Sequence, residues 1–240
     1  MNIMLNNVLI NTMKIKLFLL CTIFGIVATS CETTSGEPTG LGVETENFIS
    51  CYKYLTGVKA VFPQGTSVLV ISDTSCAYLT DGQLDSIRTK YDDTHYNGWT
   101  LDPRIAYANE FTGVTVTSDQ EFNGIPAGEN IGSLIKIISI SPYKWLLSKG
   151  ALNYDWSDPP VEYEGLDRFR ITPVRYTAKQ YHPLVKVLTE LNKEDLLLLD
   201  GSNDIILRFT GTPEIKHHNL TVTFYDTKGS FSATVDATFD

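Results

Sequence analysis

The sequence predicts a mainly β protein, built as an antiparallel β-sandwich with one to three short helices. The strongest evidence is at the C-terminus, where apolar and polar residues alternate over residues 220–225 and again over residues 231–239. Strict alternation indicates strands with one buried face, and the intervening segment 226–229 (Asp-Thr-Lys-Gly) has the residues of a tight hairpin turn. The helical patterns elsewhere in the chain are few and short.

The earlier strands are predicted from apolar, often β-branched runs that are bounded by turn residues. A Pro-Gln-Gly segment separates the first two runs, and valine alternates with threonine in the third. In chain order the runs cover residues 58–62, 67–72, 114–116, 134–140 and 204–209. Strands are therefore expected along most of the chain.

Three short helices are predicted between these strands. One begins near Asp81 and would place Leu84 and Tyr91 on one face. A second covers residues 143–149, which follow a Ser-Pro pair and precede a glycine, and a third covers residues 183–191. The expected architecture resembles immunoglobulin-like or transthyretin-like sandwiches, a likeness that does not settle function.

The first 30 residues have the pattern of a signal peptide. Lys14 and Lys16 precede an apolar run over residues 17–27, and small residues follow that run. A run of this length predicts a removable signal, because a membrane-spanning helix needs about 20 apolar residues. Residues 1–12 carry no charge and precede a second methionine, so Met13 is an alternative start of translation.

The residues Ala28, Thr29, Ser30 and Cys31 resemble the lipobox of bacterial lipoproteins, with alanine at the position of the usual leucine, as in Bacteroidetes-type proteins. The resemblance implies that the mature chain starts at Cys31 and that this cysteine carries a diacylglycerol and acyl chains such as palmitate. It also implies a lipid-anchored place at the cell outer membrane, with the domain facing the periplasm or the cell surface and the bilayer as partner. The alternative is an ordinary secretory signal that leaves Cys31 as a free thiol.

Composition divides the rest of the chain into a tether and a domain. Residues 31–46 are rich in Thr, Ser, Gly, Pro and Glu and are expected to form a flexible tether, while residues 47–240 are expected to form a single β-rich domain. Because two lysines are the only charges before Cys31, the chain from Cys31 on has 17 basic and 28 acidic residues, a net charge of −11. Nucleic acid is not an expected partner, since phosphate binding needs clustered Lys and Arg.

Cys51 and Cys76 are the cysteines that remain after removal of the signal and lipidation of Cys31. In an oxidising compartment this even pair predicts a disulfide, which would stabilise the fold by roughly 3 kcal/mol. The alternative is a pair of buried, reduced cysteines that pack as small apolar residues.

No motif for catalysis stands out, and no cofactor is expected. The sequence lacks G-x-S-x-G, H-E-x-x-H and C-x-x-C patterns and a phosphate-binding glycine loop. His217 and His218 would point to opposite faces of a strand and are interpreted as edge or loop residues. The protein is therefore not expected to be an enzyme, and a cell-envelope hydrolase that uses His95 or His182 is the second alternative function.

A weak metal candidate lies in residues 93–98, whose sequence Asp-Thr-His-Tyr-Asn-Gly follows the start of a calcium-binding loop. Arg104 stands where such a loop needs a bidentate glutamate, so a complete site is not expected. The ligands of a noncanonical site would be Asp92, Asp93, Asn97 and Asp102. A polar turn is the alternative interpretation.

Aromatic residues gather in two polar segments. These residues are Tyr91, Tyr96 and Trp99 in the first segment, and Tyr143, Trp145, Tyr154 and Trp156 in the second. Aromatic rings pack on the apolar faces of sugars while nearby polar groups bind the hydroxyls, so Tyr96, Trp99, Trp145 and Trp156 are candidate ligand-binding residues. Packing in the core or at its rim is the alternative.

The expected function is a non-enzymatic binding or assembly module, anchored at the outer membrane and acting on an envelope protein or a glycan. The first alternative is a glycan-binding accessory protein of a polysaccharide uptake system. Residues 113–128 resemble segments of uncharacterised Bacteroidetes-type lipoproteins, a likeness that implies no activity. An unpaired last strand would be able to accept a strand from another chain.

Overall fold

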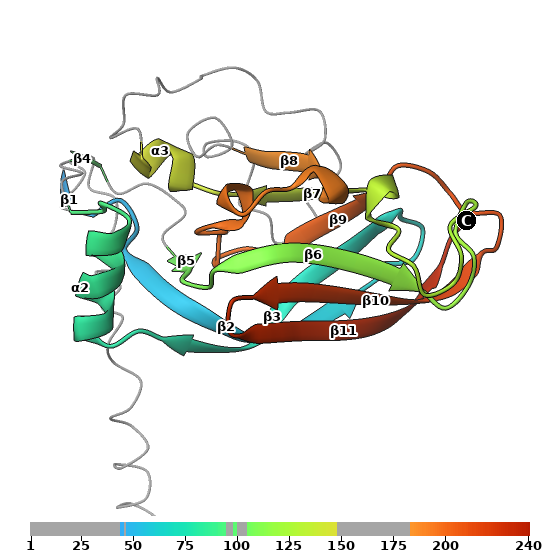
Figure 1. The fold of residues 1–240 in the computed structure, drawn as a ribbon, viewed down its shortest axis with the longest axis horizontal. Coiled ribbons are helices and arrows are strands. Elements are labelled where there is room, and N and C mark those ends of the chain that lie inside the picture. Colours follow the sequence, from blue (N-terminus) through green and yellow to red (C-terminus); the bar gives the residue numbers. More distant parts are fainter. Residues whose placement is uncertain (1–43, 46, 95–97, 100–104, 148–182) are drawn as a thin grey trace, which may run out of the picture. The chain divides into compact units, whose positions relative to one another are not determined.

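The computed structural model describes residues 44–45, 47–94, 98–99, 105–147 and 183–240, all of which belong to one compact unit, Gly42–Asp240. The prediction of a mainly β fold is confirmed, because strands far outnumber helices in the described chain and form two sheets (Figure 1). A separate two-residue pair joins β1 (Glu44–Thr45) to β4 (Gly98–Trp99). Within the described residues, no helix has the length and apolar character needed to cross a membrane.

The smaller sheet has three antiparallel strands in the order β11-β10-β6. Its strands are β6 (Phe111–Ser118), β10 (His217–Asp226) and β11 (Gly229–Thr238). The predicted C-terminal hairpin is confirmed, with ten unbroken pairs from His217↔Thr238 to Asp226↔Gly229. The Asp226 carboxylate accepts a hydrogen bond from the Lys228 amide (2.8 Å) and so stabilises the turn.

The larger sheet has six strands in the order β5-β2-β3-β9-β7-β8. Its strands are β2 (Cys51–Val61), β3 (Val68–Tyr78), β5 (Ile105–Tyr107), β7 (Ile135–Ile140), β8 (Pro183–Val187) and β9 (Ile205–Phe209). All neighbours are antiparallel except β2 and β5, which run parallel. The sandwich is therefore antiparallel with one parallel pair at its edge.

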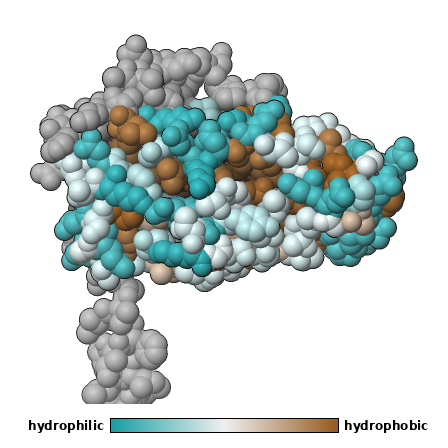
Figure 2. Space-filling view, in the orientation of Figure 1, coloured by the Kyte–Doolittle hydropathy of each residue, from teal (hydrophilic) through white to brown (hydrophobic). Residues whose placement is uncertain are grey.

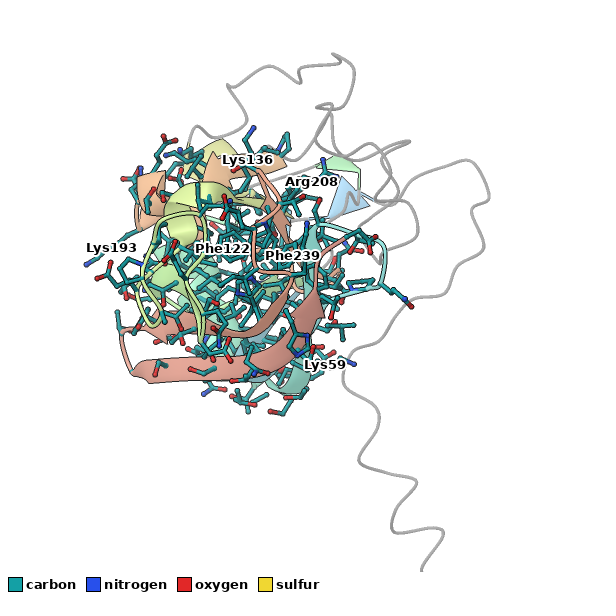
Figure 3. The ribbon with its side chains drawn as sticks, turned by 90° about the vertical axis from the view of Figure 1, so that its right-hand side faces the viewer. Lys59, Phe122, Lys136, Lys193, Arg208 and Phe239 are labelled. Atoms are coloured by element: carbon teal, nitrogen blue, oxygen red, sulfur yellow. The ribbon has the colours of Figure 1, made fainter. Side chains whose placement is uncertain are left out.

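The main core lies between the two sheets and draws residues from both, including Leu69, Ile137, Leu207, Val222 and Phe224. Each of these side chains is fully buried. Strand β10 alternates because its other face is exposed, whereas β3, β7 and β9 carry continuous apolar runs because a second cluster, with Val70, Ile138 and Ile206, covers their other face. The core ends in an aromatic cluster of Phe62, Phe122, Phe209 and Phe239, whose ring centroids lie 4.7–6.2 Å apart. Figure 3 shows Phe122 and Phe239 inside the domain when it is viewed from this end.

Two helices are described, α2 (Asp81–Lys90) and α3 (Tyr143–Leu147), with 3-10 turns at Gly132–Leu134, Leu188–Glu190 and Glu194–Leu196. The prediction of a helix over residues 183–191 is wrong, because Pro183–Val187 form strand β8. Val185 and Val187 are β-branched and pair with β7, and their spacing fits a strand as well as a helix face.

The predicted disulfide between Cys51 and Cys76 is wrong, because the structure does not join the two sulfurs. In the β2–β3 ladder Cys76 lies opposite Leu55, four positions along β2 from Cys51. That separation is about 13 Å at the rise of a strand, whereas a disulfide needs Cα atoms within about 7 Å. The reduced pair, named as the alternative, agrees with the burial of Cys51 in the sheet.

Candidate ligand site at the α2 end

The candidate site lies at the end of the domain that carries α2, α3 and the start of β2. Helix α2 begins after Thr80, whose carbonyl accepts from the Leu84 amide (2.8 Å) and whose amide donates to the Gln83 side chain (2.9 Å). Ile87 is the buried residue of this helix, and it packs in a second cluster with Phe48, Tyr52 and Ala106. Tyr91 caps the helix at its C-terminal end.

Asp93 joins the end of α2 to the start of the domain. Its side chain is 1% exposed and accepts hydrogen bonds from the Phe48 amide (2.5 Å), the Ile49 amide (3.1 Å) and the Tyr52 hydroxyl (2.8 Å). Burial raises the pKa of Asp93, and these three donors oppose the rise. Burial also raises the pKa of Tyr52, and the neighbouring carboxylate adds to the effect.

In the weak metal candidate, Asp93 has a structural role, because both oxygens of its carboxylate accept hydrogen bonds from the protein. Asn97 and Asp102 lie outside the described residues. Among the residues that are described, no three His, Cys, Asp or Glu side chains meet in a way that would hold a metal ion. Asp93 thus acts as a buried structural acceptor.

The two aromatic segments found in the sequence meet at this end of the domain. The ring of Tyr91, at the end of α2, makes an edge-to-face contact with the ring of Tyr143 in α3, with centroids 5.8 Å apart and planes at 85°. The candidate Trp145 lies in the same helix as Tyr143, and the candidate Trp99 lies in β4. The other two candidates, Tyr96 and Trp156, lie outside the described residues.

Two hydrogen-bond donors, one in α2 and one at its C-terminal end, are buried and have no acceptor among the described residues. They are the hydroxyl of Tyr91, whose side chain is only 6% exposed, and the Nε–H of Arg88, one turn earlier in α2. Buried polar groups in proteins are almost always hydrogen-bonded, so unpaired ones need an explanation. One explanation is a ligand that supplies the missing acceptors.

The charges beside Tyr91 are paired. Lys90 lies over the Tyr91 ring, 5.2 Å from its centroid, and forms an ion pair with Glu110. The Glu110 carboxylate raises the pKa of Lys90, while burial raises the pKa of the Tyr91 hydroxyl. The hydroxyl therefore remains protonated at neutral pH and is available as a donor.

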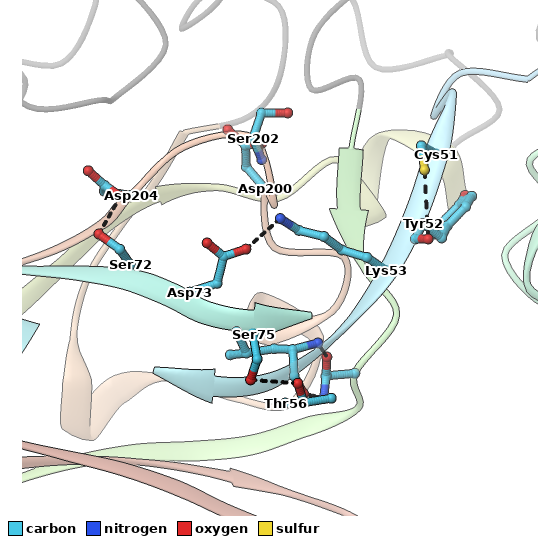
Figure 4. A network of polar contacts seen from close by, with 12 residues as sticks. Cys51, Tyr52, Lys53, Thr56, Ser72, Asp73, Ser75, Asp200, Ser202 and Asp204 are labelled. Atoms are coloured by element: carbon cyan, nitrogen blue, oxygen red, sulfur yellow. Dashed lines mark hydrogen bonds and ion pairs between the residues drawn. The ribbon is translucent and has the colours of Figure 1, made fainter. Parts of the chain in front are cut away.

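A polar network on the other side of β2 has a structural role (Figure 4). The Lys53 ammonium is buried, contacts Asp73 at 2.7 Å and lies 5.1 Å from the centroid of the Tyr107 ring. Burial and the surrounding carboxylates, Asp73 first, raise the pKa of Tyr107. A neighbouring turn is closed by Asp200, which accepts from the Ser202 amide at 2.7 Å. The Lys53 contacts join β2, β3 and β5, and the turn is attached to β5 by backbone bonds from the Tyr107 amide to the Leu199 carbonyl and from the Gly201 amide to the Ile105 carbonyl.

His218 and Ser118 form a buried pair that was not predicted. The Ser118 hydroxyl lies 2.8 Å from His218 Nδ1, and His218 Nε2 lies 2.7 Å from the Ile215 carbonyl oxygen. His218 is fully buried, whereas His217 on the opposite face is exposed, as expected for neighbours in a strand. Their interpretation as edge or loop residues is wrong, because β10 is the central strand of its sheet. His95 and His182 lie outside the described residues.

Sequence reasoning missed Arg88, Tyr52 and the Lys53 network. The spacing of Arg88 and Tyr91, three residues apart, places both on neighbouring positions of a helix and was a usable signal. The Tyr52–Asp93 bond had no such signal, since 41 residues separate its partners.

Comparison with known proteins adds no relative. No protein-family model, no curated protein and no solved structure matches the chain.

Proposed function

We propose that the protein is a lipoprotein of the cell outer membrane that acts as a binding module, with its ligand site at the α2 end. The anchor is Cys31, and the tether ends where the compact unit begins at Gly42, shortly before Glu44 and Thr45 pair with β4. Two acyl chains on one glycerol hold a protein stably on a membrane, whereas one chain holds it only marginally. The ligand site is thereby held at the envelope, where an extracellular or periplasmic ligand is available.

The observation that carries the proposal is the pair of buried, unpaired donors beside a contact between two tyrosine rings. The Tyr91 hydroxyl and Arg88 Nε each lack an acceptor, and the rings of Tyr91 and Tyr143 meet between α2 and α3. Ligand sites combine mostly apolar, aromatic walls with a few well-placed polar groups. This end of the domain has both components.

A glycan is the ligand class that these groups favour. Sugar rings present an apolar face for tyrosine and oxygen acceptors for O–H and N–H donors. Trp99 and Trp145 lie in β4 and α3, and α3 also carries Tyr143. The chain would then serve as the glycan-binding component of a polysaccharide uptake system.

The test is a binding assay with a panel of purified plant, host and bacterial polysaccharides. The full chain, extracted from membranes in detergent, is compared with its Tyr91→Phe variant, which removes one hydroxyl and keeps the ring. Tyr225→Phe is the matched control, because it removes the same atom from an exposed tyrosine on the outer face of the three-stranded sheet. We expect the wild type to bind at least one glycan. Its affinity should fall about tenfold or more in Tyr91→Phe and stay unchanged in Tyr225→Phe. Equal binding by both variants would refute the site.

A further inference from the structure

The outer face of the three-stranded sheet is covered by hydroxyl groups. Alternate residues of its strands point outward, and most of them are Thr or Ser. They are Thr115 and Thr117 in β6, Thr221 and Thr223 in β10, and Ser230, Ser232, Thr234 and Thr238 in β11. Figure 2 shows the neutral colour of such residues across the part of the surface where Figure 1 places these strands. The face ends at β11, which is an edge strand.

The two edges of this sheet differ. Along β6 a neighbouring segment pairs with the strand: the Gly128 amide donates to the Ser118 carbonyl (2.7 Å), and the Ile131 amide donates to the Val116 carbonyl (2.8 Å). The Asn130 side chain accepts from the Val116 amide (3.2 Å). The β6 edge is therefore closed by the chain itself.

The β11 edge has no such backbone pairing among the described residues. Along an antiparallel pair, the N–H and C=O groups of successive residues point alternately toward the partner strand and away from it. Two backbone bonds show which residues of β11 point toward β10. The Phe239 amide donates to the Lys216 carbonyl (2.8 Å), and the Asn219 carbonyl accepts from Asp119 on the β6 side (3.2 Å). The residues of β11 whose N–H and C=O groups point away from β10 are Ser230, Ser232, Thr234, Asp236 and Thr238. All five are exposed, and no backbone bond joins them to another described strand.

Natural proteins protect long edge strands with Lys, Pro or bulges. Residues 229–238 contain none of these: the ladder to β10 is unbroken, and Asp236 is the one charged residue. Strand β2 runs beside β11, from Tyr54 under Lys228 to Phe62 against Phe239, but no ladder joins the two strands, and Phe231 and Val235 stay partly exposed. An added strand would satisfy the backbone groups and cover these apolar side chains.

We infer that the occupant of this edge is β11 of a second copy of the chain, related by a two-fold axis at Thr234. The five outward residues are evenly spaced about Thr234. An antiparallel partner centred there places Thr234 opposite Thr234, Ser232 opposite Asp236, and Ser230 opposite Thr238. Every outward backbone group then faces another outward group, and each such pair forms two hydrogen bonds.

Charge and size also select this register. A two-fold axis at Asp236 would place two carboxylates directly opposite each other, which destabilises a pair of strands. The axis at Thr234 instead gives each Asp236 carboxylate a serine hydroxyl as its neighbour. On the core side it places Phe231 opposite Ala237 and Val235 opposite Ala233, so that a large side chain meets a small one. The product is a continuous six-stranded sheet with one hydroxyl-covered face.

The experiment is co-purification of two differently tagged full-length copies from detergent-solubilised membranes. We compare the wild type, Thr234→Lys, Thr234→Glu, a mixture of these two variants, and Thr115→Lys as a control on the same face away from the edge. We expect the two tagged copies to co-purify for the wild type and for Thr115→Lys. For each Thr234 variant alone, the amount of the second copy that co-purifies should fall at least tenfold. The mixture should restore this amount, because Lys and Glu then lie opposite each other at the axis. Thermal unfolding establishes that each variant is folded.

Three results would overturn the inference. The first is a wild type that does not co-purify with itself. The second is a mixture of Thr234→Lys and Thr234→Glu that is as weak as either variant alone, which would exclude the axis at Thr234. The third is recovery of a different protein on β11 in place of a second copy. The experiment does not depend on the α2-end site, so its failure leaves the proposed function in place.

Discussion

Replacement of Tyr91 by phenylalanine is expected to stabilise the protein. Its hydroxyl is buried and donates to no acceptor among the described residues, and its side chain is 6% exposed. A buried polar group without a partner costs about 1–3 kcal/mol, so removal of the hydroxyl should raise the free energy of unfolding by about 1 kcal/mol. For a domain of this size, that change corresponds to a melting temperature about 2–4 °C higher.

Tyr52 supplies a matched control with the opposite expectation. It is also buried, at 0% exposed, but its hydroxyl donates to the Asp93 carboxylate at 2.8 Å. A hydrogen bond to a charged group contributes about 1.5–3 kcal/mol, so Tyr52→Phe should lower the free energy of unfolding by about 2 kcal/mol. The two substitutions remove the same atom from two tyrosines of one apolar cluster.

The assay is urea unfolding of the wild type and both variants at pH 7, followed by circular dichroism. The slopes of the free energy against urea should be equal, since neither change alters the surface exposed on unfolding. A Tyr91→Phe variant that is less stable than the wild type by 1 kcal/mol or more would refute the reasoning, because it would mean that the hydroxyl has a partner in the folded protein.

Three further outcomes are expected. Burial alone would raise the pKa of Asp195, but the Asn192 amide, Lys186 and Lys144 lower it from 3.8 to about 2, which corresponds to about 2 kcal/mol. This contribution is present above the unfolded pKa and is lost as pH falls through about 2. In urea unfolding, Asp195→Asn should therefore lower the free energy of unfolding at pH 7 and change it little near pH 2. An equal effect at the two pH values would contradict this prediction. Cys51 and Cys76 should both react with a thiol reagent in urea without reductant. A pair that does not react would show that the two cysteines form a disulfide. Cys31→Ala should move the protein to the soluble fraction, and its persistence in membranes would count against the anchor.

The sequence predicted best the strands that have one buried and one exposed face. From Leu220 to Phe224 in β10 and along β11, apolar residues point to the core and polar ones to the outer face, so alternation marks both strands. The first half of β2 escaped prediction, because Cys51, Tyr52 and Lys53 are all buried and show no alternation. Residues 183–187 were misassigned, since Val185 and Val187 fit both periodicities.

The candidate site was predictable only in part. Tyr91 and Tyr143 were singled out as members of two aromatic segments, and their contact brings those segments together. The role of Asp93 depends on donors at Phe48, Ile49 and Tyr52, more than 40 residues earlier, which only the fold places beside it. The disulfide prediction was also wrong because it depended on the fold. Two remaining cysteines suggested a disulfide, but the register of β2 and β3 keeps Cys51 and Cys76 apart.

The most direct test of the proposed function is thermal unfolding of the wild type and Tyr91→Phe with and without each polysaccharide of the panel. A ligand that binds the folded state stabilises it by an amount that grows with the ratio of ligand concentration to Kd, and so raises the melting temperature. We expect a glycan that raises the melting temperature of the wild type and has a much smaller effect on Tyr91→Phe, although the variant is more stable when free. Equal shifts in the two proteins, or no shift with any glycan, would contradict a glycan site at Tyr91.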